Sequence, residues 1–167
     1  SSNYFSDAAV GFLEEQDGET PFLLYAAYTS PHDPRHAPPA FEALYDPAQI
    51  ELPPNYLPEH PFDNGELQIR DEVLLPFPRT PDGIRREIAA YYAMISEVDA
   101  QIGRILDALE SKQLMDNTII VFAGDNGLAV GQHGLLGKQN LYEHSIRVPL
   151  LIAAPGIEGG RQAPTLC

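Results

Sequence analysis

The sequence predicts an α/β domain in which helices flank a mostly parallel sheet. Apolar residues recur at helical spacing in two segments, 3–16 and 82–114. Almost unbroken apolar runs of strand length lie between and after these segments, at 22–28, 118–124 and 148–156. Apolar runs without polar alternation are typical of strands covered on both faces. Because helices and strands alternate along the chain, a layered domain with a mostly parallel sheet is favoured.

The N-terminal elements are a helix and a strand. Apolar side chains share one face of the helix predicted for residues 3–16, and the polar stretch 17–20 ends it. Pro21 then leads into FLLYAAY at 22–28, which we expect to form a buried strand.

A proline-rich stretch follows the first predicted strand. Twelve of the 16 prolines fall in residues 29–81, which leaves room only for short helices or edge pieces. Long stretches of this kind inside a compact domain are usually functional or disordered. We interpret residues 46–80 as a loop excursion packed over a rim of the domain.

The remaining elements follow in a regular order. Residues 82–114 show the clearest helical periodicity of the chain, with apolar residues at steps of three and four. A second buried strand is predicted at 118–124, followed by a glycine-rich loop at 127–137. A short helix near 140–144 and a third strand at 148–156 complete the prediction.

Composition excludes several classes of protein. The chain has 167 residues, a hydrophobic content of 44% and a formal net charge of -14. The hydrophobic content suffices for a folded core, and the acidic charge disfavours nucleic acid and anionic lipid as partners. No apolar run approaches the roughly 20 residues of a membrane span, and we expect no signal peptide at the start. The single cysteine, Cys167, cannot form an internal disulfide.

Chemically versatile side chains follow the first and second predicted strands. Because ligands bind beyond the carboxyl ends of strands in open α/β sheets, these segments form the candidate site. Asp125 and Asn126 offer hard oxygen ligands for Ca²⁺ or Mg²⁺, although Asp-Asn-Gly is also common turn chemistry. Lys138 could bind an anionic substrate or be a solvated surface residue, and His32 could move a proton or be structural.

Further polar residues of the same loops have less specific interpretations. His36, His133 and His144 carry the same ambiguity as His32, and Arg147 with Glu143 could form a structural ion pair. The sequence contains no Gly-x-Ser-x-Gly elbow. Considered together, the oxygen ligands, the lysine and the histidine favour metal-assisted hydrolysis of an anionic ester.

Several motifs, in their order and spacing, carry a resemblance to a known family. They are PFLLYAAYTSPHDPR, YYAMISEVDAQIGRILDALE and NTIIVFAGDNGLAVGQHGLLGKQNLYEHSIRVPLLIAAPG. With these motifs the sequence resembles the type I sulfatases of the alkaline phosphatase-like superfamily. The resemblance implies hydrolysis of sulfate esters by a formylglycine nucleophile and a divalent cation, usually Ca²⁺ with Mg²⁺ as the alternative.

The resemblance also implies roles for individual residues. Asp125 and Asn126 match a pair of metal ligands of the family, and Lys138 matches the lysine that contacts the sulfate. His32 matches the histidine that contacts sulfate and aids departure of the leaving group. His133 lies in a loop whose family counterpart borders the pocket, so we expect it to contact substrate.

Two family features do not occur in this sequence. One is the nucleophile motif, Cys or Ser followed by x-Pro-x-Arg, and the other is the first pair of metal-binding aspartates. Cys167 is the last residue of the sequence, and we do not expect it to be the nucleophile. We therefore expect residues 1–167 to be the central part of a sulfatase catalytic domain, inert in isolation and weak in Ca²⁺ affinity.

The resemblance leaves some alternatives open. A phosphodiesterase or phosphonate monoester hydrolase of the same superfamily would share the metal site, and a non-catalytic binding module would have lost the chemistry. Asn126 favours a sulfatase, because two-metal phosphatase relatives usually have histidine after the aspartate. The expected substrate is a sulfated small molecule or carbohydrate, and the expected compartment is periplasmic or extracellular.

Overall fold

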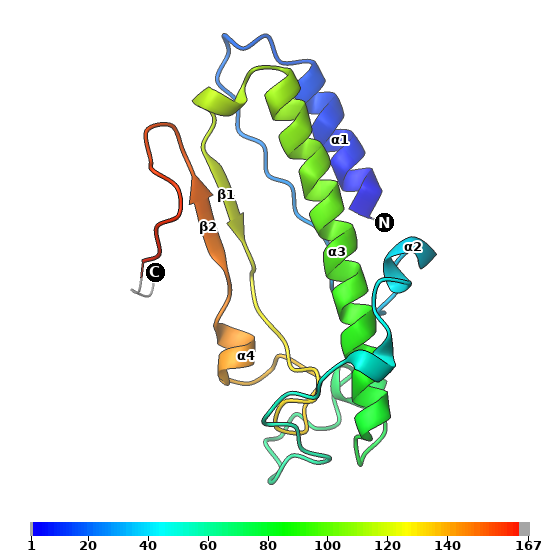
Figure 1. Ribbon diagram of the computed structural model, residues 1–167. Coiled ribbons are helices and arrows are strands. Elements are labelled where there is room, and N and C mark those ends of the chain that lie inside the picture. Colours follow the sequence, from blue (N-terminus) through cyan, green and yellow to red (C-terminus); the bar gives the residue numbers. More distant parts are fainter. Residues whose placement is uncertain (1, 164–167) are drawn as a thin grey trace.

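The computed structural model describes residues 2–163, so Cys167 lies outside the described residues. Figure 1 shows two long helices side by side, a small sheet, and a lobe of loops around one end of the longer helix. The elements are, in chain order, α1 (Ser2–Glu14), α2 (Pro39–Glu42), α3 (Pro81–Ser111), β1 (Ile120–Ala123), α4 (Glu143–Ile146) and β2 (Leu150–Ala153). Three short 3-10 turns lie at Pro47–Gln49, Glu72–Leu74 and Met115–Asn117.

Helix α3 is the longest element of the structure. It confirms the helix that the sequence predicts most clearly, at 82–114. Its N-terminus is capped by Thr80, whose side chain accepts a 3.1 Å hydrogen bond from the backbone N–H of Gly83. Pro81 occupies the first turn, where its missing N–H costs no intrahelical hydrogen bond. Its 31 residues give a length of about 46 Å, enough to support two separate apolar clusters.

The two clusters lie at opposite ends of α3. At its C-terminal end, Ala108 and Leu109 pack with Leu13 of α1 and Leu114. At its N-terminal end, the buried residues are Ile84, Ile88, Val130 and Leu136, with side chains of the proline-rich stretch packed against them. The second cluster therefore holds residues 50–75 and 128–136 against one end of the helix, in the lobe of loops seen in Figure 1.

The described sheet corrects the expected strand pairing. The sequence predicts a mostly parallel sheet, whereas β1 and β2 pair antiparallel, with Ile120 opposite Ala153 and Ala123 opposite Leu150. The chain between them reverses direction through α4 without a crossover helix of the length that parallel neighbours need. The α/β class itself is supported by the structural neighbours reported below.

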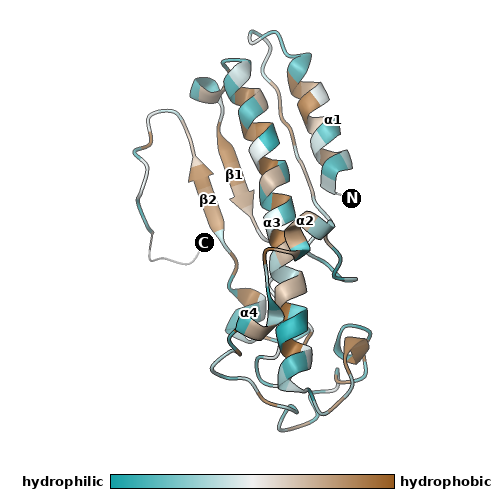
Figure 2. Ribbon diagram, turned by 45° about the vertical axis from the view of Figure 1, so that its right-hand side comes forward, coloured by the Kyte–Doolittle hydropathy of each residue, from teal (hydrophilic) through white to brown (hydrophobic). Residues whose placement is uncertain are grey.

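The apolar runs are less buried than predicted. Residues 22–28 are extended but pair with no strand among the described residues, and Leu23 and Tyr25 are 92% and 88% exposed. Both strands also expose apolar side chains, and Figure 2 shows them coloured hydrophobic on an open side of the structure. Among the described residues, Phe22, Leu24 and Ile120 pack against the cluster that α1 and α3 form, whereas Leu23 and Tyr25 are exposed.

The predicted short helix near 140–144 occurs as α4, three residues later at its start. The proline-rich stretch contains only short elements, as expected. Among residues 2–163, no helix combines the length and the hydropathy that a membrane crossing requires.

Candidate functional site

A cavity of about 120 Å³ lies where the loops after the extended segment and after β1 meet the start of the lobe. It is lined by four residues that the sequence singled out, His32, Asp125, Asn126 and Lys138. These residues come from three loops that are up to 106 positions apart in sequence, from His32 to Lys138. The cavity also contains Asp33, Arg35, Asp71 and Tyr91, which the sequence did not single out.

The Asp125-Asn126 turn follows β1 directly. Asp125 Oδ1 accepts a 2.8 Å hydrogen bond from the N–H of Asn126, and Asn126 Nδ2 donates to the carbonyl of Gly127 at 2.8 Å. This hydrogen bond uses only the amide nitrogen of the Asn126 side chain, so its Oδ1 can accept from or coordinate a ligand. Gly127 packs so closely on α4 that a Cβ there would lie 2.0 Å from the carbonyl oxygen of His144. The turn is thus held in place by backbone contact that admits no side chain.

These donors suit a hard cation in type but not in number. A carboxylate and an amide oxygen are ligands of the kind that Ca²⁺ and Mg²⁺ take, but Ca²⁺ takes six to eight oxygens. Within residues 2–163, no group of three His, Cys, Asp or Glu residues is arranged to hold a metal ion. Asp125 and Asn126 can therefore supply part of a cation site, which needs further oxygen ligands.

Lys138 is held in the cavity by a buried network that starts in the proline-rich stretch. Glu72 accepts hydrogen bonds from the N–H of Leu136 at 2.9 Å and of Gly137 at 2.7 Å, directly before Lys138. The same carboxylate pairs with Arg79 at 2.8 Å, and both side chains are almost fully buried. Burial lowers the pKa of Arg79, and the negative charge of Glu72 opposes that shift.

Asp71 adds a second contact to the Lys138 loop. Its Oδ2 accepts a 3.1 Å hydrogen bond from Gln139 Nε2. Burial alone raises the pKa of Asp71, but hydrogen bonds from Arg70 and Gln139 outweigh burial, so the pKa lies below its usual value. The carboxylate therefore stays charged in the cavity wall at neutral pH.

His32 is oriented by its neighbour in the sequence. Its Nδ1 lies 3.0 Å from the backbone oxygen of Asp33 and 3.1 Å from the Asp33 carboxylate. With two acceptors at this distance, Nδ1 carries the proton in the neutral ring. Nε2 is then the free acceptor of the ring, and it faces Arg70 Nη2 at 3.5 Å.

Arg35 is the most buried cation of the cavity. Its side chain is 4% exposed, and it forms an ion pair with Glu87 of α3. Its Nε atom is buried without a hydrogen-bond partner among the described residues. Burial raises the pKa of the neighbouring Tyr91, while the positive charge of Arg35 opposes that shift.

His133 does not line this cavity. Its ring stacks on Tyr142 with centroids 4.2 Å apart, and its Nε2 lies 3.0 Å from Asn55 Nδ2. The nearby His144 is half-buried, and burial, followed by the charge of His133, lowers the pKa of His144 to about 4. A substrate contact by His133 stays a prediction. The Arg147–Glu143 pair occurs, but it is exposed and 3.9 Å long.

Three of the residues around the cavity that the sequence did not identify are consecutive, Arg70, Asp71 and Glu72. They lie in a proline-rich stretch without periodicity, where charged residues are ordinarily solvated. The one sequence feature that could have indicated these residues is a run of three charged residues between two apolar residues, Ile69 and Val73. This feature is weak evidence by itself.

Comparison with solved structures defines the class of the fold. The chain superimposes on a phosphonate monoester hydrolase of Agrobacterium radiobacter with a TM-score of 0.80 and 27% sequence identity, covering 93% of this chain and 33% of that one. The fold and the cavity thus define an incomplete α/β domain of the alkaline phosphatase-like class.

Sequence comparisons narrow that class. The sulfatase family model matches residues 1–166. The chain is 36% identical to a choline-sulfatase of Rhizobium meliloti, over 87% of its own length, and 33% identical to human iduronate 2-sulfatase, over 90%. The chain belongs to the sulfatase family. It spans 29% and 30% of the lengths of these two relatives.

Proposed function

We propose that this chain is the central part of an enzyme that hydrolyses sulfate esters. The observation that supports the proposal is the convergence of His32, Asp125, Asn126 and Lys138 in one cavity. Relatives that are named sulfatases strengthen it. The formylglycine nucleophile is expected in a part of the enzyme outside residues 1–167.

Each residue has a chemical role in the proposal. Asp125 and Asn126 contribute oxygens to a Ca²⁺ site, and the bound cation supplies positive charge that stabilises the transferring sulfate. Lys138 donates hydrogen bonds to the sulfate oxygens as a point charge. His32 lines the same cavity, and the Nε2 of its protonated ring donates a hydrogen bond to the oxygen of the departing alcohol. Such preorganised donors stabilise charge that develops in the transition state.

The test is hydrolysis of 4-nitrophenyl sulfate by the full-length protein in the presence of Ca²⁺. We expect Lys138→Ala to lower kcat/KM by roughly a hundred-fold or more, the effect typical of removing a transition-state donor. The matched control is Lys112→Ala, because Lys112 is the other lysine of the chain and bonds to the carbonyl of Glu14, far from the cavity. Equal activity of the two variants would contradict the proposed role of Lys138.

A second candidate function is hydrolysis of phosphonate monoesters or phosphodiesters. The structural neighbour from Agrobacterium radiobacter carries that name. Assay of sulfate and phosphonate monoesters with the same leaving group separates the two candidates by the ratio of their kcat/KM values. Absence of turnover with both would favour a non-catalytic binding module.

A further inference from the structure

We infer that Arg70 is a specificity-determining residue that binds a second anionic group of the substrate beside the sulfate being cleaved. The inference rests on the proposed function and adds to it the class of substrate. The second group is a carboxylate or a further sulfate, both of which offer several acceptor oxygens to an arginine fork.

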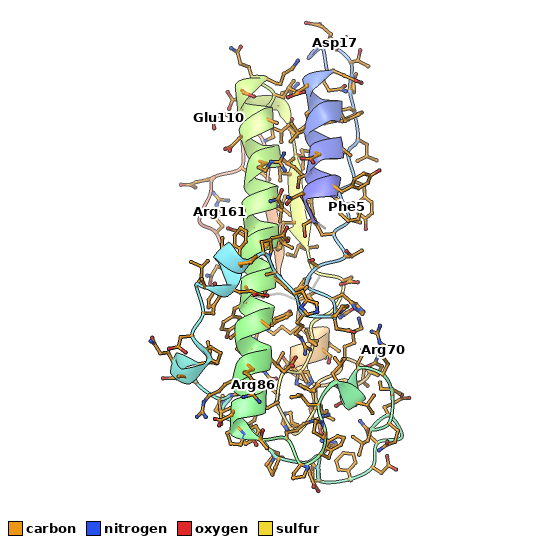
Figure 3. The ribbon with its side chains drawn as sticks, turned by 90° about the vertical axis from the view of Figure 1, so that its right-hand side faces the viewer. Phe5, Asp17, Arg70, Arg86, Glu110 and Arg161 are labelled. Atoms are coloured by element: carbon orange, nitrogen blue, oxygen red, sulfur yellow. The ribbon has the colours of Figure 1, made fainter. Side chains whose placement is uncertain are left out.

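The position of Arg70 is the first observation. It belongs to the proline-rich stretch, and Figure 3 shows it on the loops that flank the N-terminal half of α3. Its Nη2 lies 3.1 Å from Asp33 Oδ1, 2.7 Å from Asp71 Oδ1 and 3.5 Å from His32 Nε2. All three partners line the cavity. Arg70 therefore stands at the rim of the cavity, next to the histidine expected at the leaving group.

The orientation of the guanidinium is the second observation. Its Nε and Nη2 atoms bond to Asp71, and Nη2 bonds also to Asp33, so one edge of the fork is fixed. Nη1 makes no hydrogen bond to a residue in the range 2–163. Two carboxylates thus orient the planar guanidinium, while donors on its other edge are available for a ligand.

Charge exposure is the third observation. The side chain of Arg70 is 63% exposed, whereas those of Asp33 and Asp71 are 13% and 10% exposed. The two carboxylates are thus largely covered, whereas the guanidinium that they bind is open to solvent. A hydrogen bond from Arg70 to Asp71 and the charge of Asp33 raise the pKa of Arg70, so it remains charged at every working pH.

A purely structural role predicts a different result. If Arg70 only bridged the loops at 32–33 and 70–71, its loss would displace His32 and lower turnover of every substrate alike. If it binds a second anion, its loss affects substrates that carry that anion more than those that lack it. Comparing two substrates in the same variant separates the two roles, because damage to His32 cancels in the ratio.

The experiment uses the full-length protein with phenyl sulfate, 3-carboxyphenyl sulfate and a disulfated glucosamine. We expect the wild type to have a higher kcat/KM for 3-carboxyphenyl sulfate than for phenyl sulfate, because the leaving groups are alike and only the first substrate carries a second anion for Arg70. In Arg70→Gln, the ratio of kcat/KM for 3-carboxyphenyl sulfate over phenyl sulfate falls about ten-fold or more, the equivalent of losing one charge-assisted hydrogen bond, mainly through KM. The disulfated sugar tells whether a second sulfate or a carboxylate is preferred.

The matched control is Arg86→Gln, which removes the same charge from an exposed position on α3 (Figure 3) and leaves the ratio unchanged. An equal loss for both aryl sulfates in Arg70→Gln would overturn the inference and assign Arg70 a positioning role. Equal kcat/KM of the wild type for 3-carboxyphenyl sulfate and phenyl sulfate would overturn it too. Inactivity of the wild type on all sulfate esters would refute the proposed function itself, and this inference with it.

Discussion

Replacement of Glu72 by glutamine tests the network that holds the Lys138 loop. Glu72 and Arg79 are 3% and 1% exposed. The Glu72 carboxylate accepts hydrogen bonds from Arg79 and from the backbone N–H groups of Leu136 and Gly137. A glutamine has one acceptor oxygen, so its NH₂ group would face at least one of these donors. Arg79 would also lose its only carboxylate partner among the described residues. Removing one member of a buried ion pair costs about 3–5 kcal/mol, because the remaining charge is left unpaired.

Urea denaturation followed by circular dichroism measures that cost as a lower midpoint. The matched control is Glu66→Gln, since Glu66 is an exposed carboxylate of the same stretch and surface substitutions stay within about 0.5 kcal/mol. The double variant Glu72→Gln/Arg79→Met should recover part of the loss, because the unpaired charge is gone. If Glu72→Gln unfolds at the same midpoint as Glu66→Gln, the reasoning about the buried pair is wrong.

Two further predictions concern protons and metal. His144 has a pKa of about 4 in the folded protein against an ordinary value of 6.5, so the unfolded chain binds more protons between these values. The free energy of unfolding should therefore fall as the pH drops from 6.5 to 4, by about 1–2 kcal/mol after discounting for a half-buried ring, and His144→Gln should flatten that slope in pH-dependent urea titrations. An unchanged slope would contradict the assigned cause. Calorimetric titration of this 167-residue chain should show only weak Ca²⁺ binding that Asp125→Asn abolishes, since two ligands are far fewer than the cation takes. Tight, stoichiometric binding would contradict the partial donor set.

Much of the fold and of the site could be predicted from local pattern. The periodicity of α3, its Thr80-Pro81 start and the helix at the N-terminus depend on neighbouring residues, so the sequence shows them directly. That His32, Asp125, Asn126 and Lys138 meet at one cavity was predictable because they follow strand-like runs, where α/β folds bind ligands. A motif of one or two residues is weak evidence by itself. It becomes informative when several such motifs are predicted at the same edge of the sheet.

Strand pairing and burial could not be predicted in the same way. An apolar run such as 22–28 fits a strand that is buried on both faces, but burial depends on which layers pack against it. Among the described residues, Phe22 and Leu24 pack against the cluster that α1 and α3 form, whereas Leu23 and Tyr25 are exposed. The antiparallel pairing of β1 with β2 likewise depends on the path of the intervening chain, which no local periodicity encodes.

Local sequence thus establishes the helices, the acidic composition and the family motifs, and it identifies four candidate site residues, because each depends on short-range pattern or residue type. Only the tertiary structure shows that Glu72 supports the Lys138 loop across 65 positions, from Glu72 to Gly137, and that Arg70 reaches His32 across 38. Contacts between such distant positions follow from how the loops pack on the N-terminal half of α3. That packing is a property of the folded chain, and it brings charged residues that are distant in sequence together around one cavity.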